Sequence, residues 1–193
     1  AVKAAAFTGA FAINPETIAA VAGAISPVVN VLGGDVTASI TNSQINKFTD
    51  NTVGAAVRVL ATSDAQTRNI VGSLAVSSGG AAAAGLVTNV IERKTHAVVA
   101  DTDIGSGSED LAVRARAAFD TGNIIAGLGG GIVGVAGSAG VNTFVGETVA
   151  SVSGGEIDVR DLSILSNSAV RDFAVAGNMA VGAVTLAAAV ALT

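Results

Sequence analysis

The sequence predicts an all-β protein, a parallel β-solenoid built from about three to four degenerate repeats of 50–63 residues. Three observations lead to this fold class: similar stretches recur along the chain, part of each repeat alternates apolar and polar residues, and small side chains replace bulky ones. We expect residues 1–193 to form a single repeat-array domain. Its units are expected at residues 9–71, 72–126 and 127–176, with a truncated unit at 177–193.

Three stretches of the chain align without gaps: VTASITNSQI (36–45), THAVVADTDI (95–104) and TVASVSGGEI (148–157). Their shared apolar columns are Ala38, Ala97 and Ala150, then Ile40, Val99 and Val152, then Ile45, Ile104 and Ile157. An Asn recurs in the same phase upstream, within VVNV, VTNV and GVNTFV. These columns predict stacked coils in which equivalent residues lie above one another.

A second set of similarities marks the start of each unit. A leading glycine recurs at Gly9, Gly72, Gly127 and Gly177, with steps of 63, 55 and 50 residues. The tripeptides NIV (69–71) and NII (123–125) strengthen the match between two of the copies. The repeat period is therefore loose but recognisable.

Strands are predicted in the charged half of each unit, most clearly in LAVRARAAF (111–119). Strand side chains alternate between two faces, so Leu111, Val113, Ala115, Ala117 and Phe119 would share one face. In a helix, Arg114 and Arg116 would lie about 200° apart and no apolar stripe would form. The Ala/Gly/Val-rich runs of the other half are typical of strands buried on both faces.

One local exception to the strand pattern is NPETIAAVAGAI, which begins at Asn14. An Asn before Pro, with Glu in the first turn, is a fair helix start. A short helical insertion is therefore expected near residues 15–25.

The composition limits the kinds of core and site that the chain can build. Half of the residues are apolar, but there are 24 Gly, only 6 Phe and no Tyr or Trp. Because large aromatics usually supply most of a compact core, this chain must bury Ala, Val, Ile and Leu in thin layers. The absence of Cys excludes disulfides, thiolate nucleophiles and Cys-based metal sites.

Charge is sparse, with 13% charged residues and a net charge of −5. The ten Lys and Arg are scattered, so no nucleic-acid partner is expected. The stretches 69–91, 121–146 and 173–193 carry no charge and are long enough for a membrane helix of about 20 residues. Polar and Gly-rich interruptions argue against that structure, so no integral membrane segment is expected.

Two long stretches match a known repeat pattern: AAAAGLVTNVIERKTHAVVADTDI followed by LAVRARAAF, and AGSAGVNTFVGETVASVSGGEIDV followed by LSILSNSAV. In these stretches the chain resembles the large filamentous adhesins of bacteria, including the leukotoxin-like filamentous adhesin family. The junction ATSDAQTRNIVGSLAV (61–76) is also similar, although the Tyr common in that family is missing here. The resemblance implies an extracellular β-solenoid stalk at the bacterial cell surface, part of a larger exported protein, without enzymatic activity.

His96 is the only histidine and aligns with Thr37 and Val149. Because it adjoins the inward Ala97, it should face outward on a strand. Zinc is not expected without a second His or a Cys, and no catalytic partner set is recognisable. We therefore expect a structural histidine, no catalytic residue and no enzyme.

Four carboxylates, Asp101, Asp103, Glu109 and Asp110, lie within DTDIGSGSED. They could bind Ca²⁺ through oxygen ligands, although their spacing fits neither an EF-hand nor the Gly-rich nonapeptide. The favoured interpretation is a solvated polar turn, with Ca²⁺ as the alternative and no other cofactor. The run GLGGGIVG lacks the G-K-[ST] of a phosphate loop and indicates tight turns and close sheet packing.

The basic side chains could form a patch on one solenoid face: Arg58, Arg68, Arg93, Lys94, Arg114 and Arg116. Arg93 and Lys94 are expected in a turn. Such a patch could contact an acidic receptor or glycan, although a solvated face is the commoner outcome.

Three functional hypotheses follow. The first is a structural or adhesive segment, a rigid stalk or fibre that displays binding regions and meets an unknown host or bacterial receptor. The second is a self-assembling subunit of an extracellular fibre or shell, motivated by the wholly apolar stretch 173–193, which stops within a repeat. Its partners would be the rest of a longer chain or identical subunits. The third is a helical membrane protein.

Overall fold

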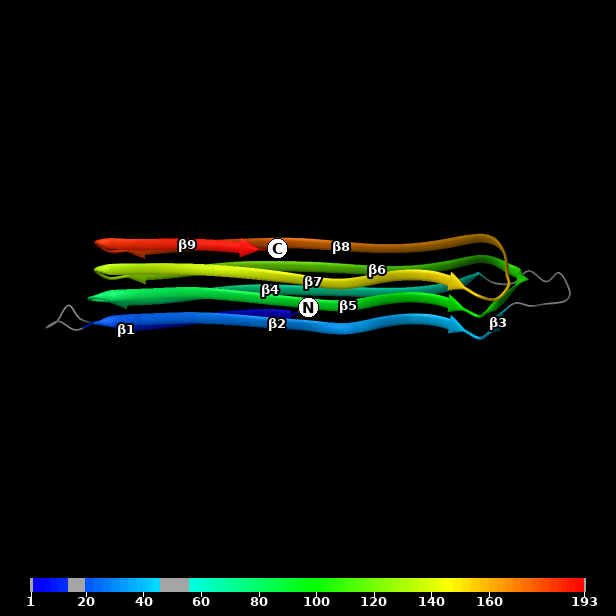
Figure 1. Ribbon diagram of the computed structural model, residues 1–193, viewed down its shortest axis with the longest axis horizontal. Helices are drawn as coiled ribbons and strands as arrows, with labels where there is room; N and C mark the ends of the chain where they lie inside the picture. The colour runs from blue at the N-terminus through cyan, green and yellow to red at the C-terminus, as the bar shows by residue number, and fades with distance from the viewer. Residues whose placement is uncertain (1, 14–19, 46–55, 193) are drawn as a thin grey trace.

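The computed structural model of the chain describes residues 2–13, 20–45 and 56–192, and in these residues it contains strands and no helix. The two sheets lie face to face, and their strands run along the long axis of the molecule (Figure 1). The strands are β1 (Val2–Ala12), β2 (Val21–Thr41), β3 (Gln44–Ile45), β4 (Val57–Ser77), β5 (Gly80–Ala100), β6 (Asp103–Gly130), β7 (Val133–Ser153), β8 (Ile157–Val181) and β9 (Val184–Leu192).

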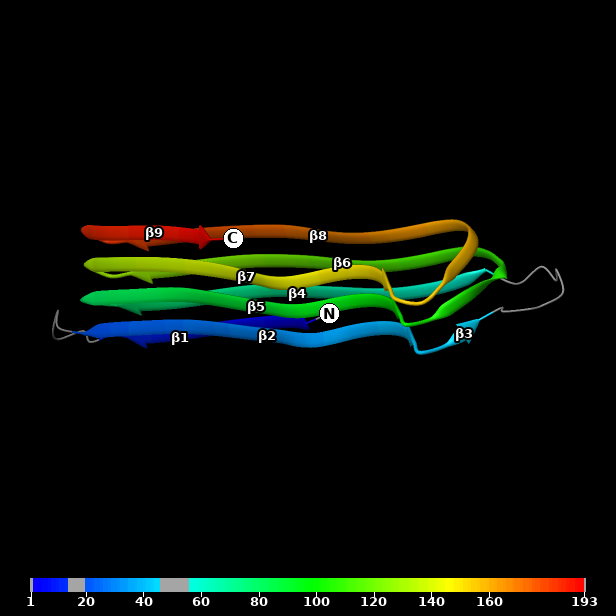
Figure 2. The ribbon, with the colours of Figure 1, turned by 45° about the vertical axis from the view of Figure 1, so that its right-hand side comes forward.

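The predicted fold class is confirmed, since every strand pairing is parallel and the chain alternates between the two sheets. Sheet A has the order β1-β4-β6-β8, with the short β3 beside the start of β6. Sheet B has the order β2-β5-β7-β9. Each coil contributes one long strand to each sheet, and successive coils stack side by side in both views (Figures 1 and 2).

The apolar columns predicted from the repeats are confirmed by the strand register. Ala38 pairs with Ala97, which pairs with Ala150, and Ile104 lies between Ile45 and Ile157. In sheet B, successive strands are offset by 59, 53 and 51 residues, as shown by the series Val21, Gly80, Val133 and Val184.

The glycine alignment at the unit starts differs from the register by one or two residues. Gly72 pairs with Phe7 and with Ala126, not with Gly9 and Gly127. The reason is steric, because a Cβ on Gly72 would lie 2.6 Å from Cδ1 of Phe7. Gly72 therefore makes room for an aromatic ring.

The helix expected near residues 15–25 is wrong over the part that can be compared. Residues 14–19 lie outside the described residues, while 21–25 form the start of β2. There Ala22 and Ala24 are buried while Val21 and Ile25 are exposed, an alternation of period two. Pairing with β5 satisfies the backbone in place of helical hydrogen bonds.

The core changes character along the strands. At the end where β4 turns into β5 it is a thin layer of alanines, Ala22, Ala24, Ala75, Ala81 and Ala83. At the opposite end it contains larger side chains, including Val59, Val99, Ile104, Leu111 and Val113. The alternation predicted for 111–119 is confirmed, since its five apolar residues are buried and both arginines are exposed.

Turns from sheet B back to sheet A use residues that tolerate a left-handed backbone. Asn42 and Asp101 have φ of 48° and 49°, and Gly154 has φ of 68°. The three follow register-matched residues, so they occupy one position in successive coils. Asn, Asp and Gly are the residues that adopt this conformation most readily.

In their described residues, the three charge-free stretches form strands joined by short turns, and they gather at one end of the stack, at the left of Figure 1. Among the described residues, the structure contains no helix that is both long and apolar enough to cross a membrane.

Candidate functional site

The candidate site is the charged half of the outer surface of sheet A, which we call the arginine face. It is defined by the outward side chains Arg58, Arg68, Arg114, Arg116 and Arg171 on β4, β6 and β8. These residues face out because their neighbours, such as Leu111 and Val113, fill the core. Because strand side chains alternate between two faces, arginines from three coils lie together on the outer surface of sheet A.

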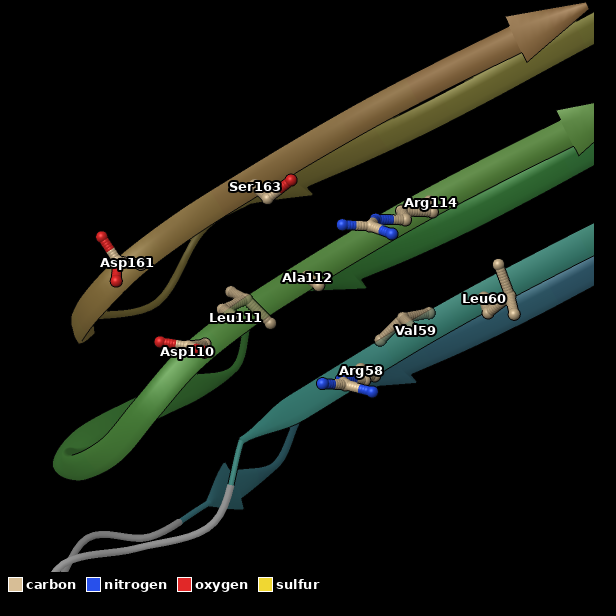
Figure 3. Close-up of a pocket in the computed structure, with 9 residues that line it drawn as sticks. All are labelled: Arg58, Val59, Leu60, Asp110, Leu111, Ala112, Arg114, Asp161 and Ser163. Carbon is tan, nitrogen blue, oxygen red and sulfur yellow. The ribbon is translucent and has the colours of Figure 1, made fainter.

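A shallow hollow of about 360 Å³ opens on this face (Figure 3). Arg58 comes from β4, Arg114 from β6 and Ser163 from β8, while Asp110 and Asp161 lie toward one end. Arg58 and Arg114, like Arg116 beyond them, form no ion pair or hydrogen bond within the described part of the chain. The hollow therefore presents unneutralised guanidinium groups.

One other cation of the arginine face, Arg68, is held by a carboxylate. Arg68 donates two hydrogen bonds to Asp120, at 3.0 Å from Nη1 to Oδ1 and 2.6 Å from Nη2 to Oδ2, and Gln66 donates a third at 3.1 Å. The hydrogen bond from Arg68 lowers the pKa of Asp120, and the same bond raises the pKa of Arg68. Gly122 allows this arrangement, since a Cβ there would lie 2.9 Å from Cδ of Arg68.

Arg160 neutralises the acidic rim of the hollow. Its Nη2 lies 3.1 Å from Oδ1 of Asp110, and its Nε lies 3.4 Å from Oδ2 of Asp161. Because Asp110 is engaged in this way, the free guanidinium groups of Arg58 and Arg114 remain available to an external anion.

The candidate calcium ligands are distributed along β6 and the turn before it. Asp101 occupies the left-handed turn position, and Asp103 accepts a hydrogen bond from the backbone N–H of Glu156 at 3.0 Å. Asp110 pairs with Arg160, and the side chain of Glu109 lies outside the described residues. Within the described residues, no three His, Cys, Asp or Glu side chains come together as a metal site.

His96 lies on the outer surface of sheet B, in register with Thr37 and Val149 as the alignment predicts. Its Nε2 is 3.7 Å from Oε2 of Glu147, and its side chain is 30% exposed. The imidazole is thus a partly exposed surface group beside one carboxylate.

The expected patch is split among three locations, and its two central residues are not in a turn. Arg93 and Lys94 belong to the continuous strand β5. Arg93 points inward and donates from Nη1 to the carbonyl oxygen of Asp64 at 3.1 Å, while Lys94 is exposed on sheet B. The inward position is open because Arg93 pairs in register with Gly34 and Gly146, which have no side chains to block it.

The Gly-rich run 127–134 serves close packing of the two sheets. A Cβ on Gly129 would lie 2.3 Å from the carbonyl oxygen of Val135, and one on Gly134 would lie 2.9 Å from that of Val181. Any side chain would therefore push the backbones apart.

A buried asparagine ladder, made of Asn30, Asn69, Asn89, Asn123 and Asn142, crosses the core between the sheets. The Nδ2 groups of Asn30, Asn69 and Asn89 each donate once within their own sheet and once across to the other sheet, at 2.6–3.1 Å. Asn123 donates across to Asn142 at 2.9 Å. The last donor reaches Asp172 at 2.8 Å. The recurrence of Asn was visible in the sequence, but the alternation between sheets was not, because it requires the two strands of each coil to be at matching heights.

The arginine face carries side chains that are able to bind anions. Guanidinium groups bind carboxylate, sulfate and phosphate through paired N–H donors. Comparison with known proteins adds no family to this description: no protein-family model matches the chain, and no curated protein or solved structure is significantly similar to it.

Proposed function

We propose that the chain is a structural and adhesive segment of a secreted bacterial surface protein, a rigid β-solenoid that displays a binding face. The observation that supports this most directly is the continuous register of β4 with β6 and of β5 with β7, held internally by the asparagine ladder. A one-residue slip would move every apolar side chain to the wrong face and break the ladder. The segment therefore resists bending and sliding between coils.

The dimensions of the segment suit presentation of a wide surface better than extension over a long distance. Each further coil uses 51–54 residues, as the offsets of β6, β7, β8 and β9 show. Stacking adds only about 4.8 Å per coil, while a strand of 21 residues extends about 70 Å. Such a segment is a broad, stiff ribbon with two wide faces, which suits presentation of a surface.

The arginine face is the part of the ribbon proposed to meet the receptor. Its unpaired cations, Arg58, Arg114 and Arg116, lie on neighbouring strands of an otherwise acidic protein. A polyanionic glycan or an acidic protein surface would match them.

Rigidity and binding can be tested separately. Spin labels on cysteines introduced at Lys3 and Gly177, both exposed on the outer surface of sheet A, should give one narrow distance distribution by pulsed electron paramagnetic resonance when the labelled chain is diluted with unlabelled chain. A broad distribution would contradict the rigid scaffold. For binding, the wild-type chain should be retained on a sulfated-polysaccharide matrix, and the triple variant Arg58→Ser, Arg114→Ser, Arg116→Ser should elute at lower salt. Equal elution would remove the arginine face from the proposal.

The second candidate function is a self-assembling subunit that joins end to end. It is favoured by the outer edges of β8 and β9, which pair with no strand among the described residues, and by core-facing side chains of β8 that stay exposed, such as Leu162 and Ile164. Unpaired edges are templates for another chain. Ala189→Lys, an inward charge on β9, should abolish filaments seen by electron microscopy; filaments that persist would exclude assembly through this edge.

A further inference from the structure

The outer surface of sheet B at the charge-free end is a second exposed feature, which we call the apolar face. It comprises the outward residues of β2 from 21 to 31, β5 from 80 to 90, β7 from 133 to 143, and β9. Val21 is 76% exposed, Leu186 64% and Ile25 63%, and the face carries no charged residue. Strands that are apolar on both sides normally have both sides covered, but here the structure covers only the inner one.

We propose that the apolar face binds the same face of a second copy of this chain, related by a two-fold axis that runs parallel to the strands between β5 and β7. This symmetry places β5 over β7 of the second copy and β2 over β9, with matched heights along the strands. The contact is isologous, so it forms a closed pair. It is distinct from end-to-end assembly and from the arginine face, which lies on the other sheet.

Side-chain sizes are complementary under this symmetry. Residues that pair in register between β5 and β7 become facing residues across the interface, and in several of these pairs a larger side chain is opposite Gly or Ala. Leu86 faces Ala139 of the second copy, because the two are partners in the β5–β7 register. By the same symmetry Ala82 faces Val135 of the second copy, and Ala84 faces Gly137, a pair in which both residues are small.

The outer strands continue the pattern, as Gly23 and Leu186 share a height, and so do Ile25 and Ala188. At these two heights the bulky residue of one copy faces Gly or Ala of the other, as interdigitation of packed sheets requires, whereas Val21 faces Val184 at the end of the strands.

Charges are complementary at the edge of the apolar face. Lys94 and Glu147 pair in register, so each faces the opposite charge on the second copy. Both side chains are exposed in the single chain. A two-fold axis through β5 would instead place β5 over β5 of the second copy and bring Lys94 opposite Lys94. The charges therefore favour the proposed axis.

The area is sufficient for a stable pair. Four strands spaced about 4.8 Å apart, each with about 11 residues rising about 3.3 Å, cover about 700 Å² per copy. Stable interfaces bury about 800 Å² per partner, and the largest apolar patch on an ordinary monomer is about 300–600 Å². The straight strands seen in Figures 1 and 2 allow contact along the whole length.

Two outward glycines provide a matched test by sedimentation velocity of the intact chain. An added Cβ meets nothing within 4 Å at Gly137, on the apolar face, or at Gly177, on sheet A. Both Gly137→Glu and Gly177→Glu should therefore fold as the wild type does, which circular dichroism checks. We expect wild type and Gly177→Glu to be dimers, and Gly137→Glu to raise the dimer dissociation constant about 100-fold or more, because it buries an unpaired charge.

The axis is tested by mixing single-cysteine variants, which is simple because the chain has no Cys. A short bismaleimide should join Ala84→Cys to Gly137→Cys more efficiently than it joins either variant to itself. Equal yields would overturn the proposed axis. A monomeric wild type at 100 µM, or an equal effect of both glutamates, would overturn the proposal. So would a wild type that floats with phosphatidylcholine vesicles while Gly137→Glu does not, since lipid would then be the occupant.

Discussion

Removal of one amide from the asparagine ladder should destabilise the protein strongly. Asn89 is fully buried and holds four ladder contacts. In Asn89→Ala, Asn30 and Asn69 each lose an acceptor for one Nδ2 hydrogen, at 2.9 Å and 3.0 Å in the native chain. The Oδ1 atoms of Asn123 and Asn142 each lose one hydrogen bond but keep another, from Asn69 and Asn123 respectively.

The magnitude follows from those two stranded donors. A buried donor without a partner costs about 1–3 kcal/mol. Asn69 is buried at 1% exposure, whereas water can reach the half-buried Asn30. The loss of unfolding free energy from the two donors together should therefore be about 2–4 kcal/mol. That is a large part of the roughly 5–15 kcal/mol by which domains are stable.

Urea unfolding followed by circular dichroism measures this loss through the midpoint at unchanged slope. The matched control is Asn167→Ala, because Asn167 is exposed on the outer side of β8 and should lose less than about 0.5 kcal/mol. The double variant Asn89→Ala, Asn123→Ala should lose less than the sum of the single losses, because the two residues share contacts. A loss in Asn89→Ala no larger than that in Asn167→Ala would refute the reasoning.

Three further predictions concern backbone space and acid stability. Gly155→Ala should destabilise by about 1–3 kcal/mol in urea, because φ is 72° and the Cβ would meet a carbonyl oxygen at 2.2 Å, whereas Gly177→Ala should change little. Gly85→Ala should cost about 1–3 kcal/mol, since its Cβ would lie 2.7 Å from a buried isoleucine methyl; an unchanged thermal midpoint would contradict this. The lowered pKa of Asp120 means that its ion pair stabilises the fold above the ordinary value of 3.8 and is lost as pH falls through the lowered value. Asp120→Asn should therefore flatten the acid side of the stability profile measured by urea midpoint, as should Arg68→Gln.

Strand periodicity and chain repetition were readable without the tertiary structure. The alternation in 111–119 follows from a period of two, and the columns through Ala97 and Ile104 follow from equivalence between coils. The position of His96 follows from the same alignment. Each of these inferences compares residues that lie a short distance apart or one repeat apart.

Two predictions from the sequence were wrong because they depend on the neighbouring strands. Arg93 looked like a turn residue because it is charged and follows an apolar run, yet two glycines on the flanking strands leave it an inward position. Residues 21–25 were expected to be helical because they follow Asn14, Pro15 and Glu16, a fair helix start, but pairing with β5 determined their backbone. Local composition does not specify which strand lies alongside.

The sequence by itself determined the fold class, the stacking columns and the small number of charged and reactive side chains, because these depend on periodicity and composition. The tertiary structure alone decided which residues meet between the sheets and on the outer faces. It brought five asparagines from two sheets into one ladder and gathered arginines from three coils on one surface. It also left uncovered an apolar surface that continuous apolar runs had suggested would be buried. The physical reason is that contacts between coils depend on register and height, which a single strand does not encode.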